Sequence, residues 1–147
     1  MPYYYFDSTA LIKRYSPELG TRIVNSLLTK RGNSAIIGAT ALAEFCSCLA
    51  RKTKQGELTR DDWYSVLFKF ESESERGAFH YVAPSNRTFA TTKRLALEYP
   101  HLQAPQLIHL ALAMELRPLR ISLVSADKQL LAACRPLRVH TLNPEDE

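Results

Sequence analysis

The sequence predicts an α/β protein with a central parallel sheet of four to five strands sandwiched by helices. Short apolar runs alternate along the chain with longer segments of helical periodicity, an order typical of parallel sheets covered by helices. The segment 107–114 is apolar nearly all round, which is expected of a buried central helix. The 147 residues fit one domain, which we expect to span residues 1–143 and to be followed by a frayed acidic tail at 144–147.

The individual elements follow from local patterns. Strands are expected over residues 3–6, 35–38, 79–82, 121–124 and 139–142. Helices are expected over residues 8–15, 19–29, 40–54, from 59 onward, 85–99, 105–116 and 128–134. Four of the helices begin at a residue type that caps helix N-termini: Ser8 or Thr9, Thr40, Thr59 and Ser85. Asp62 has the spacing to complete a capping box with Thr59.

The composition indicates a cytoplasmic protein without a membrane segment. Hydrophobic residues make up 46% of the chain, which is enough to fill a core. No apolar run approaches the roughly 18 residues that a spanning helix needs, and the N-terminus lacks the pattern of a signal peptide. The three cysteines, Cys46, Cys48 and Cys134, are odd in number and lack metal-ligand spacing, so we expect reduced thiols. The net charge of +4 permits contacts with phosphates without requiring them.

Three acidic residues follow expected strands. Asp7 comes directly after the first strand, Glu44 lies one turn into the helix after the second, and Asp127 follows the strand at 121–124. Ligand sites of open parallel sheets form beyond the carboxyl ends of the strands, so these carboxylates should converge on one pocket. Converging carboxylates repel one another unless a hard cation such as Mg²⁺ or Mn²⁺ lies between them.

Each acid also has a purely structural interpretation. Asp7 and Asp127 both precede expected helices and could act as N-caps. Glu44 is the stronger indication of a site, because it is flanked by Ala43 and Phe45, and a lone carboxylate among apolar groups is costly. A shared pocket explains all three positions at once, whereas the structural interpretation needs a separate reason for each.

Four segments in order resemble the motifs of PIN domains of the VapC toxin type. They are the opening Tyr-Tyr-Phe-Asp-Ser-Thr-Ala-Leu-Ile-Lys-Arg-Tyr, then Ala-Leu-Ala-Glu-Phe at 41–45, the segment 102–111, and Leu-Val-Ser-Ala-Asp at 123–127. The resemblance implies a PIN-like fold and a divalent-metal-dependent endoribonuclease, the toxin of a toxin–antitoxin pair. It also implies an RNA substrate, a cognate antitoxin partner and a homodimer.

The resemblance assigns roles to particular residues. Asp7, Glu44 and Asp127 would be catalytic acids that bind Mg²⁺ or Mn²⁺, with Ser8 and Ser125 supporting them by hydrogen bonds. The family usually has a fourth aspartate where this chain has Gln106. A glutamine carbonyl can bind a cation but brings no negative charge, so we expect weak metal affinity. Two outcomes stay open: a nuclease with an incomplete acidic site, or a catalytically weak or inactive module that binds RNA or a partner protein.

Other residues near these motifs are candidates for binding. His109, one turn after Gln106, could be a metal ligand, although packing or hydrogen bonding is the favoured interpretation. A basic rim could bind RNA phosphates: Lys13, Arg14, Arg51, Lys52 and Lys54. The same side chains could equally form solvated faces.

Two other α/β classes place an aspartate after the first strand. Haloacid-dehalogenase-type phosphatases need a second aspartate two residues later, where this chain has Thr9. Phosphoacceptor receiver domains need an acidic pair and a lysine that are not evident in the sequence. Neither class fits.

Overall fold

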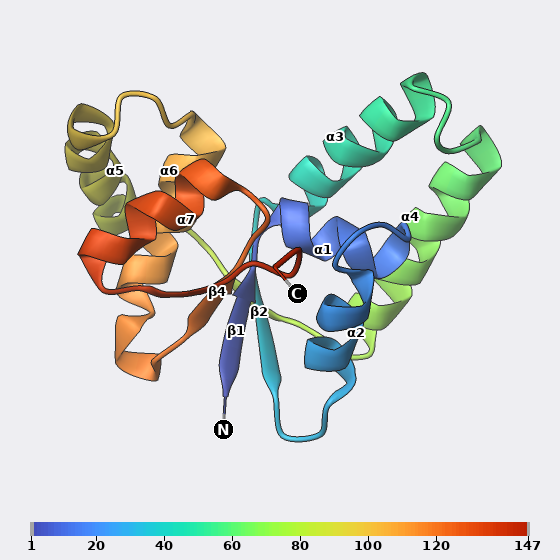
Figure 1. Ribbon diagram of the computed structural model, residues 1–147, viewed down its shortest axis with the longest axis horizontal. Helices are drawn as coiled ribbons and strands as arrows, with labels where there is room; N and C mark the ends of the chain where they lie inside the picture. The colour runs from blue at the N-terminus through green and yellow to red at the C-terminus, as the bar shows by residue number, and fades with distance from the viewer. Residues whose placement is uncertain (1, 147) are drawn as a thin grey trace.

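The computed structural model describes residues 2–146, and within them an α/β fold (Figure 1). Its strands are β1 (Tyr3–Phe6), β2 (Ser34–Gly38), β3 (His80–Val82), β4 (Ser122–Val124) and β5 (His140–Leu142). Its α-helices are α1 (Ser8–Tyr15), α2 (Thr21–Thr29), α3 (Ala41–Lys54), α4 (Arg60–Glu75), α5 (Asn86–Glu98), α6 (Ala104–Glu115) and α7 (Lys128–Cys134). Every strand and helix expected from the sequence is present, and the bounds are the same as expected or differ by at most two residues.

The five strands form one parallel sheet in the order β3-β2-β1-β4-β5. β1 is central, and its Tyr5 pairs with Ile36 on one side and with Leu123 on the other. The chain moves outward from β1 to β3 and then returns to the other side of β1 to add β4 and β5. The strand order therefore reverses between β1 and β4, and such a switch point is where parallel sheets open a crevice for ligands.

Alternate residues of the central strands face opposite sides of the sheet, as the strand period of two requires. Tyr5 belongs to one buried apolar cluster together with residues of α5, α6 and α7. Phe6 belongs to a second cluster that includes residues of α1, α2, α3 and α4. Figure 1 shows these two groups of helices on opposite sides of the sheet. The expected sandwich is thereby confirmed.

The helix caps match the sequence-based expectation in part. Thr59 and Asp62 form the expected capping box, and Ser85 caps α5. At α1 the cap is Asp7, whose side chain accepts from the Ala10 N–H, so the expected Ser8 or Thr9 cap is wrong. Thr40 also makes no side-chain cap at α3.

The C-terminal segment is packed against the domain where fraying was expected. Pro144 is buried, and the Glu145 carboxylate lies 2.7 Å from the ammonium of Lys13, which is itself 2% exposed. A Cβ atom on Gly20 would come within 2.9 Å of the Pro144 carbonyl oxygen, so the two backbones lie in close contact. The structure thus departs from the expectation at 144–146, while Glu147 lies outside the described residues.

The sequence predicts no membrane-spanning segment, and the helices of the structure can be compared with this prediction. Within residues 2–146, no helix is both long enough and apolar enough to cross a bilayer. The helix that is most apolar all round, α6, instead buries Leu110, Ala111 and Leu112 against the sheet.

Candidate functional site

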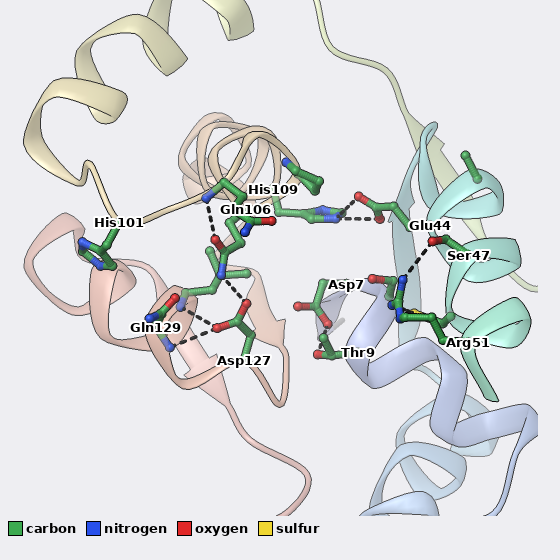
Figure 2. A pocket seen from close by; sticks show the side chains of 16 residues that line it. Asp7, Thr9, Glu44, Ser47, Arg51, His101, Gln106, His109, Asp127 and Gln129 are labelled. Atoms are coloured by element: carbon green, nitrogen blue, oxygen red, sulfur yellow. Dashed lines mark hydrogen bonds and ion pairs between the residues drawn. The ribbon is translucent and has the colours of Figure 1, made fainter. Parts of the chain in front are cut away.

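A cavity of about 550 Å³ opens at the carboxyl edge of the sheet, beyond the ends of β1 and β4. Several elements line it: the junction after β1, one face of α3, the first turns of α6, and the junction between β4 and α7 (Figure 2). The three expected acids, Asp7, Glu44 and Asp127, all lie among its lining residues. The sequence-based placement of these acids beside one cavity agrees with this geometry.

Asp7 is the most buried acid of the cavity, with 3% of its surface exposed. Its Oδ1 accepts from the Thr9 hydroxyl at 2.6 Å and from the Ala10 N–H at 3.0 Å, and its Oδ2 accepts from Ser125 at 2.5 Å. Burial raises the pKa of the Asp7 carboxyl above its ordinary value, although these hydrogen bonds and nearby His109 oppose the shift. Asp7 is therefore a rigidly held carboxylate whose negative charge is poorly solvated.

Asp127 caps α7 and also faces the cavity. Its Oδ1 accepts from the N–H groups of Gln129 and Leu130, which leaves Oδ2 turned toward α6. The side-chain amide of Gln106 donates to Oδ2 at 2.6 Å. Gln106 Oε1 in turn accepts from the Gln103 N–H at 2.7 Å, as part of a capping box at the start of α6.

The orientation of Gln106 bears on its expected role. Its N–H, and not its carbonyl, points at Asp127, because the carbonyl is engaged in capping α6. In this arrangement Gln106 acts as a donor to an acid of the cavity, which differs from the expected carbonyl ligand of a cation. Figure 2 shows the chain of bonds from the start of α6 through Gln106 to Asp127.

Glu44 is tied to a buried histidine. Both of its carboxylate oxygens lie 2.8 Å from His109 Nε2, and Nδ1 of the same ring lies 2.7 Å from the Tyr5 hydroxyl. Burial lowers the pKa of His109, but the hydrogen bond and charge of Glu44, with Asp7 and Asp127, raise it overall. The favoured interpretation of His109 as a hydrogen-bonding residue agrees with these contacts.

The two expected supporting serines have different positions. Ser125 is fully buried and donates to Asp7, and its hydroxyl also accepts from the Asp127 N–H at 3.0 Å. Ser8 lines the cavity, yet none of the hydrogen bonds found within residues 2–146 joins it to an acid.

Thr9 and Tyr5 also belong to the site, although neither was among the residues expected to form it. Thr9 donates to Asp7, lies 3.3 Å from Ser125 Oγ and accepts from the Ala126 N–H, so it joins the β1 and β4 junctions. Its spacing of two residues after Asp7 is a local signal that could have been used. Tyr5 is 104 residues from His109, and no local pattern predicts that contact.

The chemical types of the side chains in the cavity suit a hard divalent cation. The cavity presents three carboxylates from three βα junctions, and oxygen ligands are those that Mg²⁺ and Mn²⁺ prefer. The thiol of Cys48 also lines it, but burial raises the pKa of this group, which disfavours the thiolate that softer metals need. Across the part of the chain that the structure describes, however, no group of three or more His, Cys, Asp or Glu side chains is placed to hold a metal ion. The types of side chain in the cavity therefore suit a divalent cation, whereas the distances between the described side chains do not.

The five residues of the expected basic rim have different surroundings. Lys13 pairs with Glu18 and Glu145, Lys52 pairs with Glu18 and Glu57, and Arg14 pairs with Glu73. Lys54 is exposed but lies in a separate apolar hollow beside Trp63. Arg51 alone of the five lines the acidic cavity. Arg51 also borders a neighbouring hollow together with Lys13 and Lys52, so three of the five residues gather beside the acidic cavity. Contact of the five residues with RNA stays a prediction.

Comparison with known proteins identifies the fold. No protein-family model and no curated protein matches the sequence. Among solved structures, VapBC2 from Rickettsia felis bound to a DNA fragment from their promoter gives a TM-score of 0.65 at 14% identity, covering 96% of this chain and 98% of that chain. The protein PAE2754 from Pyrobaculum aerophilum gives 0.60 at 18% identity, covering 90% and 78%. A toxin–antitoxin complex from Klebsiella pneumoniae gives 0.58 at 17% identity, covering 96% and 97%.

These similarities extend over nearly the whole chain, and they concern the fold because the identities are low. The expected PIN-like fold, of the kind found in VapC-type toxins, is confirmed.

Proposed function

We propose that the chain is a divalent-metal-dependent endoribonuclease, acting as the toxin of a toxin–antitoxin pair, with an acidic site weakened by Gln106. The observation that carries this proposal is the convergence of Asp7, Glu44 and Asp127 on one cavity at the switch point of the sheet. The three residues come from separate junctions of the fold, so local capping alone does not account for their common position.

Each acid would contribute in a different way to binding Mg²⁺ or Mn²⁺. Asp7 is held by Thr9 and Ser125 and offers a carboxylate of fixed position, while Glu44 is oriented by His109. Asp127 would offer Oδ2, the oxygen that now accepts from Gln106. A bound ion of this kind lowers the pKa of its water and stabilises charge on a phosphodiester.

Gln106 supports the expectation of weak metal binding. A metal ligand at Asp127 Oδ2 competes with a 2.6 Å hydrogen bond from the Gln106 amide. The amide also leaves the cavity one negative charge short of a four-acid site. Two unit charges about 4 Å apart interact by roughly 4 kcal/mol at an effective dielectric constant of 20, so the missing charge should weaken metal binding markedly. We therefore expect slow cleavage.

A second function, binding without cleavage, is favoured by the same bonds. Every acid of the cavity already accepts hydrogen bonds from protein groups. Among residues 2–146, no three acidic, histidine or cysteine side chains are placed to hold a metal ion. In that case the protein would bind RNA or a partner protein, and the cavity would have no catalytic activity.

The proposed partners are an antitoxin and a second copy of the chain. One of the similar structures is described as a toxin–antitoxin complex, and another as VapBC2 bound to a DNA fragment from their promoter. α4 also presents two large apolar side chains to solvent, Tyr64 at 58% and Phe68 at 72% exposure, a feature expected of a face that another chain covers. Co-purification with the product of a small neighbouring gene, and a light-scattering mass of twice the chain, would each support this; a monomer with no such neighbour would count against it.

The test of the nuclease proposal is an RNA cleavage assay on the natural protein with Mg²⁺, with Mn²⁺ and with chelator. We expect slow cleavage that needs the ion and is abolished in Asp7→Asn. Asp61→Asn, which removes an exposed acid on α4 outside the cavity, is the matched control and should cleave like the natural protein. Cleavage that persists in chelator and in Asp7→Asn would refute the proposal. Absence of both cleavage and metal binding would favour the binding module.

A further inference from the structure

The cavity has a single long cationic side chain at its edge. Within residues 2–146, Arg51 is the only lysine or arginine among the residues that line it. Three of the other expected RNA-binding cations are committed to acids of the protein itself, as described above. An RNA backbone that reaches the acids must therefore enter a cavity that holds three carboxylates, and among the lysines and arginines only Arg51 lines that cavity within residues 2–146.

The helix geometry directs Arg51 toward the acids. Glu44, Cys48 and Arg51 follow one another at spacings of four and three residues, so they lie on one face of α3. Arg51 is about 10 Å along the helix from Glu44. The guanidinium donates to residues of the preceding turn, from Nη1 to Ser47 Oγ at 2.9 Å and from Nη2 to Cys48 Sγ at 3.2 Å. These bonds place the charge of Arg51 nearer to Glu44 than the backbone of Arg51 is.

The partners of Arg51 leave its charge uncompensated. Ser47 and Cys48 are neutral acceptors that fix the orientation of the guanidinium, and burial raises the pKa of the Cys48 thiol. No carboxylate forms a salt bridge with Arg51 among the described residues, in contrast to Lys13, Arg14 and Lys52. Arg51 is also exposed, so a ligand can reach it. An oriented, unpaired guanidinium is well suited to bind a phosphate through two parallel hydrogen bonds.

The opposite side of the cavity has a different chemistry. Figure 2 shows Arg51 on the α3 side, with His101 and Gln129 across the cavity and Asp7 and Asp127 between them. A single-stranded RNA crossing from one side to the other would contact the guanidinium of Arg51 at one end and the side chains of His101 and Gln129 at the other. Within residues 2–146, the one lysine or arginine side chain that lines this cavity therefore lies on the α3 side.

We infer that Arg51 is the phosphate-binding residue of the cavity, which anchors the substrate backbone on the α3 side of the acids. This inference rests on the proposed RNA function. It replaces a diffuse basic rim by one defined contact, and it gives Lys13, Arg14 and Lys52 structural roles instead.

The test measures binding of a fluorescent single-stranded RNA by anisotropy over a series of salt concentrations. All proteins carry Asp7→Asn, so that the RNA stays intact. Arg51→Ala should weaken binding about tenfold, as expected for loss of a charge-assisted contact. It should also reduce the slope of log affinity against log salt by about one phosphate contact. Arg51→Lys should restore the salt dependence but only part of the RNA affinity, because lysine keeps the charge and cannot form the two parallel hydrogen bonds of a guanidinium.

Lys54→Ala is the matched control, because it removes the same charge from an exposed site on α3 outside the cavity. It should leave affinity and slope unchanged, and melting temperatures should show that both variants are folded. If the Asp7→Asn parent binds RNA and Arg51→Ala binds it equally well with the same slope, or loses no more than Lys54→Ala, the inference is overturned while the proposed function stands. If the parent neither binds RNA nor, with Asp7 restored, cleaves it, the proposed function falls and the inference with it.

Discussion

Asp7 serves two purposes at one position. Its side chain caps α1 through the Ala10 N–H, and the same carboxylate is nearly buried at the cavity wall. Burial holds its pKa above the ordinary value, so the charged form is less stable in the folded chain than in the unfolded chain. A cap does not require this cost, because Asn, Ser or Thr can cap a helix without a charge. An aspartate at this position is therefore better explained by a ligand that needs its charge.

The raised pKa leads to a prediction for the metal-free protein. The folded carboxyl releases its proton at a higher pH than the unfolded one, whose pKa is about 3.9. The stability linked to Asp7 is then fully present below the unfolded value and is lost as pH rises through the folded value. Asp7→Asn removes this titration and keeps the cap, so it should melt at a higher temperature than the natural protein at pH 7.

The comparison that interprets this result is Asp7→Ala. It removes the charge together with the acceptor of Thr9 and Ser125, so it should be less stable than Asp7→Asn. Thermal unfolding of the three proteins from pH 3 to pH 8, in chelator, provides the measurement. Equal pH dependence of the natural protein and Asp7→Asn would show that Asp7 does not titrate abnormally.

At the scale of elements, the C-terminal segment after β5 is tied to the start of the chain. Glu145 pairs with the buried Lys13 of α1, and Pro144 covers Gly20 at the N-terminus of α2. Gly20 has φ +91°, a left-handed conformation that favours glycine, so this contact relies on the absence of a side chain. The acidic composition of 144–147 predicted fraying because composition does not reveal a buried lysine more than 130 residues away.

Substitution of Gly20 should reveal this packing. Gly20→Ala forces a left-handed alanine, which costs roughly 1 kcal/mol, and it also drives a Cβ atom against the Pro144 carbonyl. Gly32→Ala is the control, since Gly32 has φ +95° but no atom within 4 Å of its added Cβ. Urea unfolding should show Gly20→Ala to be the less stable of the two. Equal losses would mean that the segment is not packed there in solution.

At the scale of the whole molecule, the sheet determines where the acids meet. β1 is central and β4 lies beside it, so the residues that follow these strands flank the switch point. This much could be predicted from sequence, because apolar runs mark the strands and parallel strands share one carboxyl edge. The bounds of α7 were also predicted correctly from the sequence pattern of residues 128–134.

Contacts between distant segments could not be predicted in this way. The hydrogen bond of Gln106 to Asp127 and that of Glu44 to His109 join residues on different elements, and their direction depends on how α6 packs. The partners of Lys13 and Lys52 are likewise set by tertiary structure, so the sequence around a basic residue does not indicate whether its charge is paired. Periodicity locates elements, but it does not say which polar groups they bring together.

The most direct test of the central claim is a calorimetric titration of Mn²⁺ into the natural protein, Gln106→Asp and Gln103→Asp. Gln106→Asp replaces the donor to Asp127 with a fourth carboxylate, whereas Gln103→Asp adds the same charge to a lining residue that does not contact Asp127 through its side chain. We expect weak binding by the natural protein, binding at least about tenfold tighter by Gln106→Asp, as one added charge near the ion allows, and a smaller gain for Gln103→Asp. Tight binding by the natural protein that Gln106→Asp leaves unchanged would contradict the account.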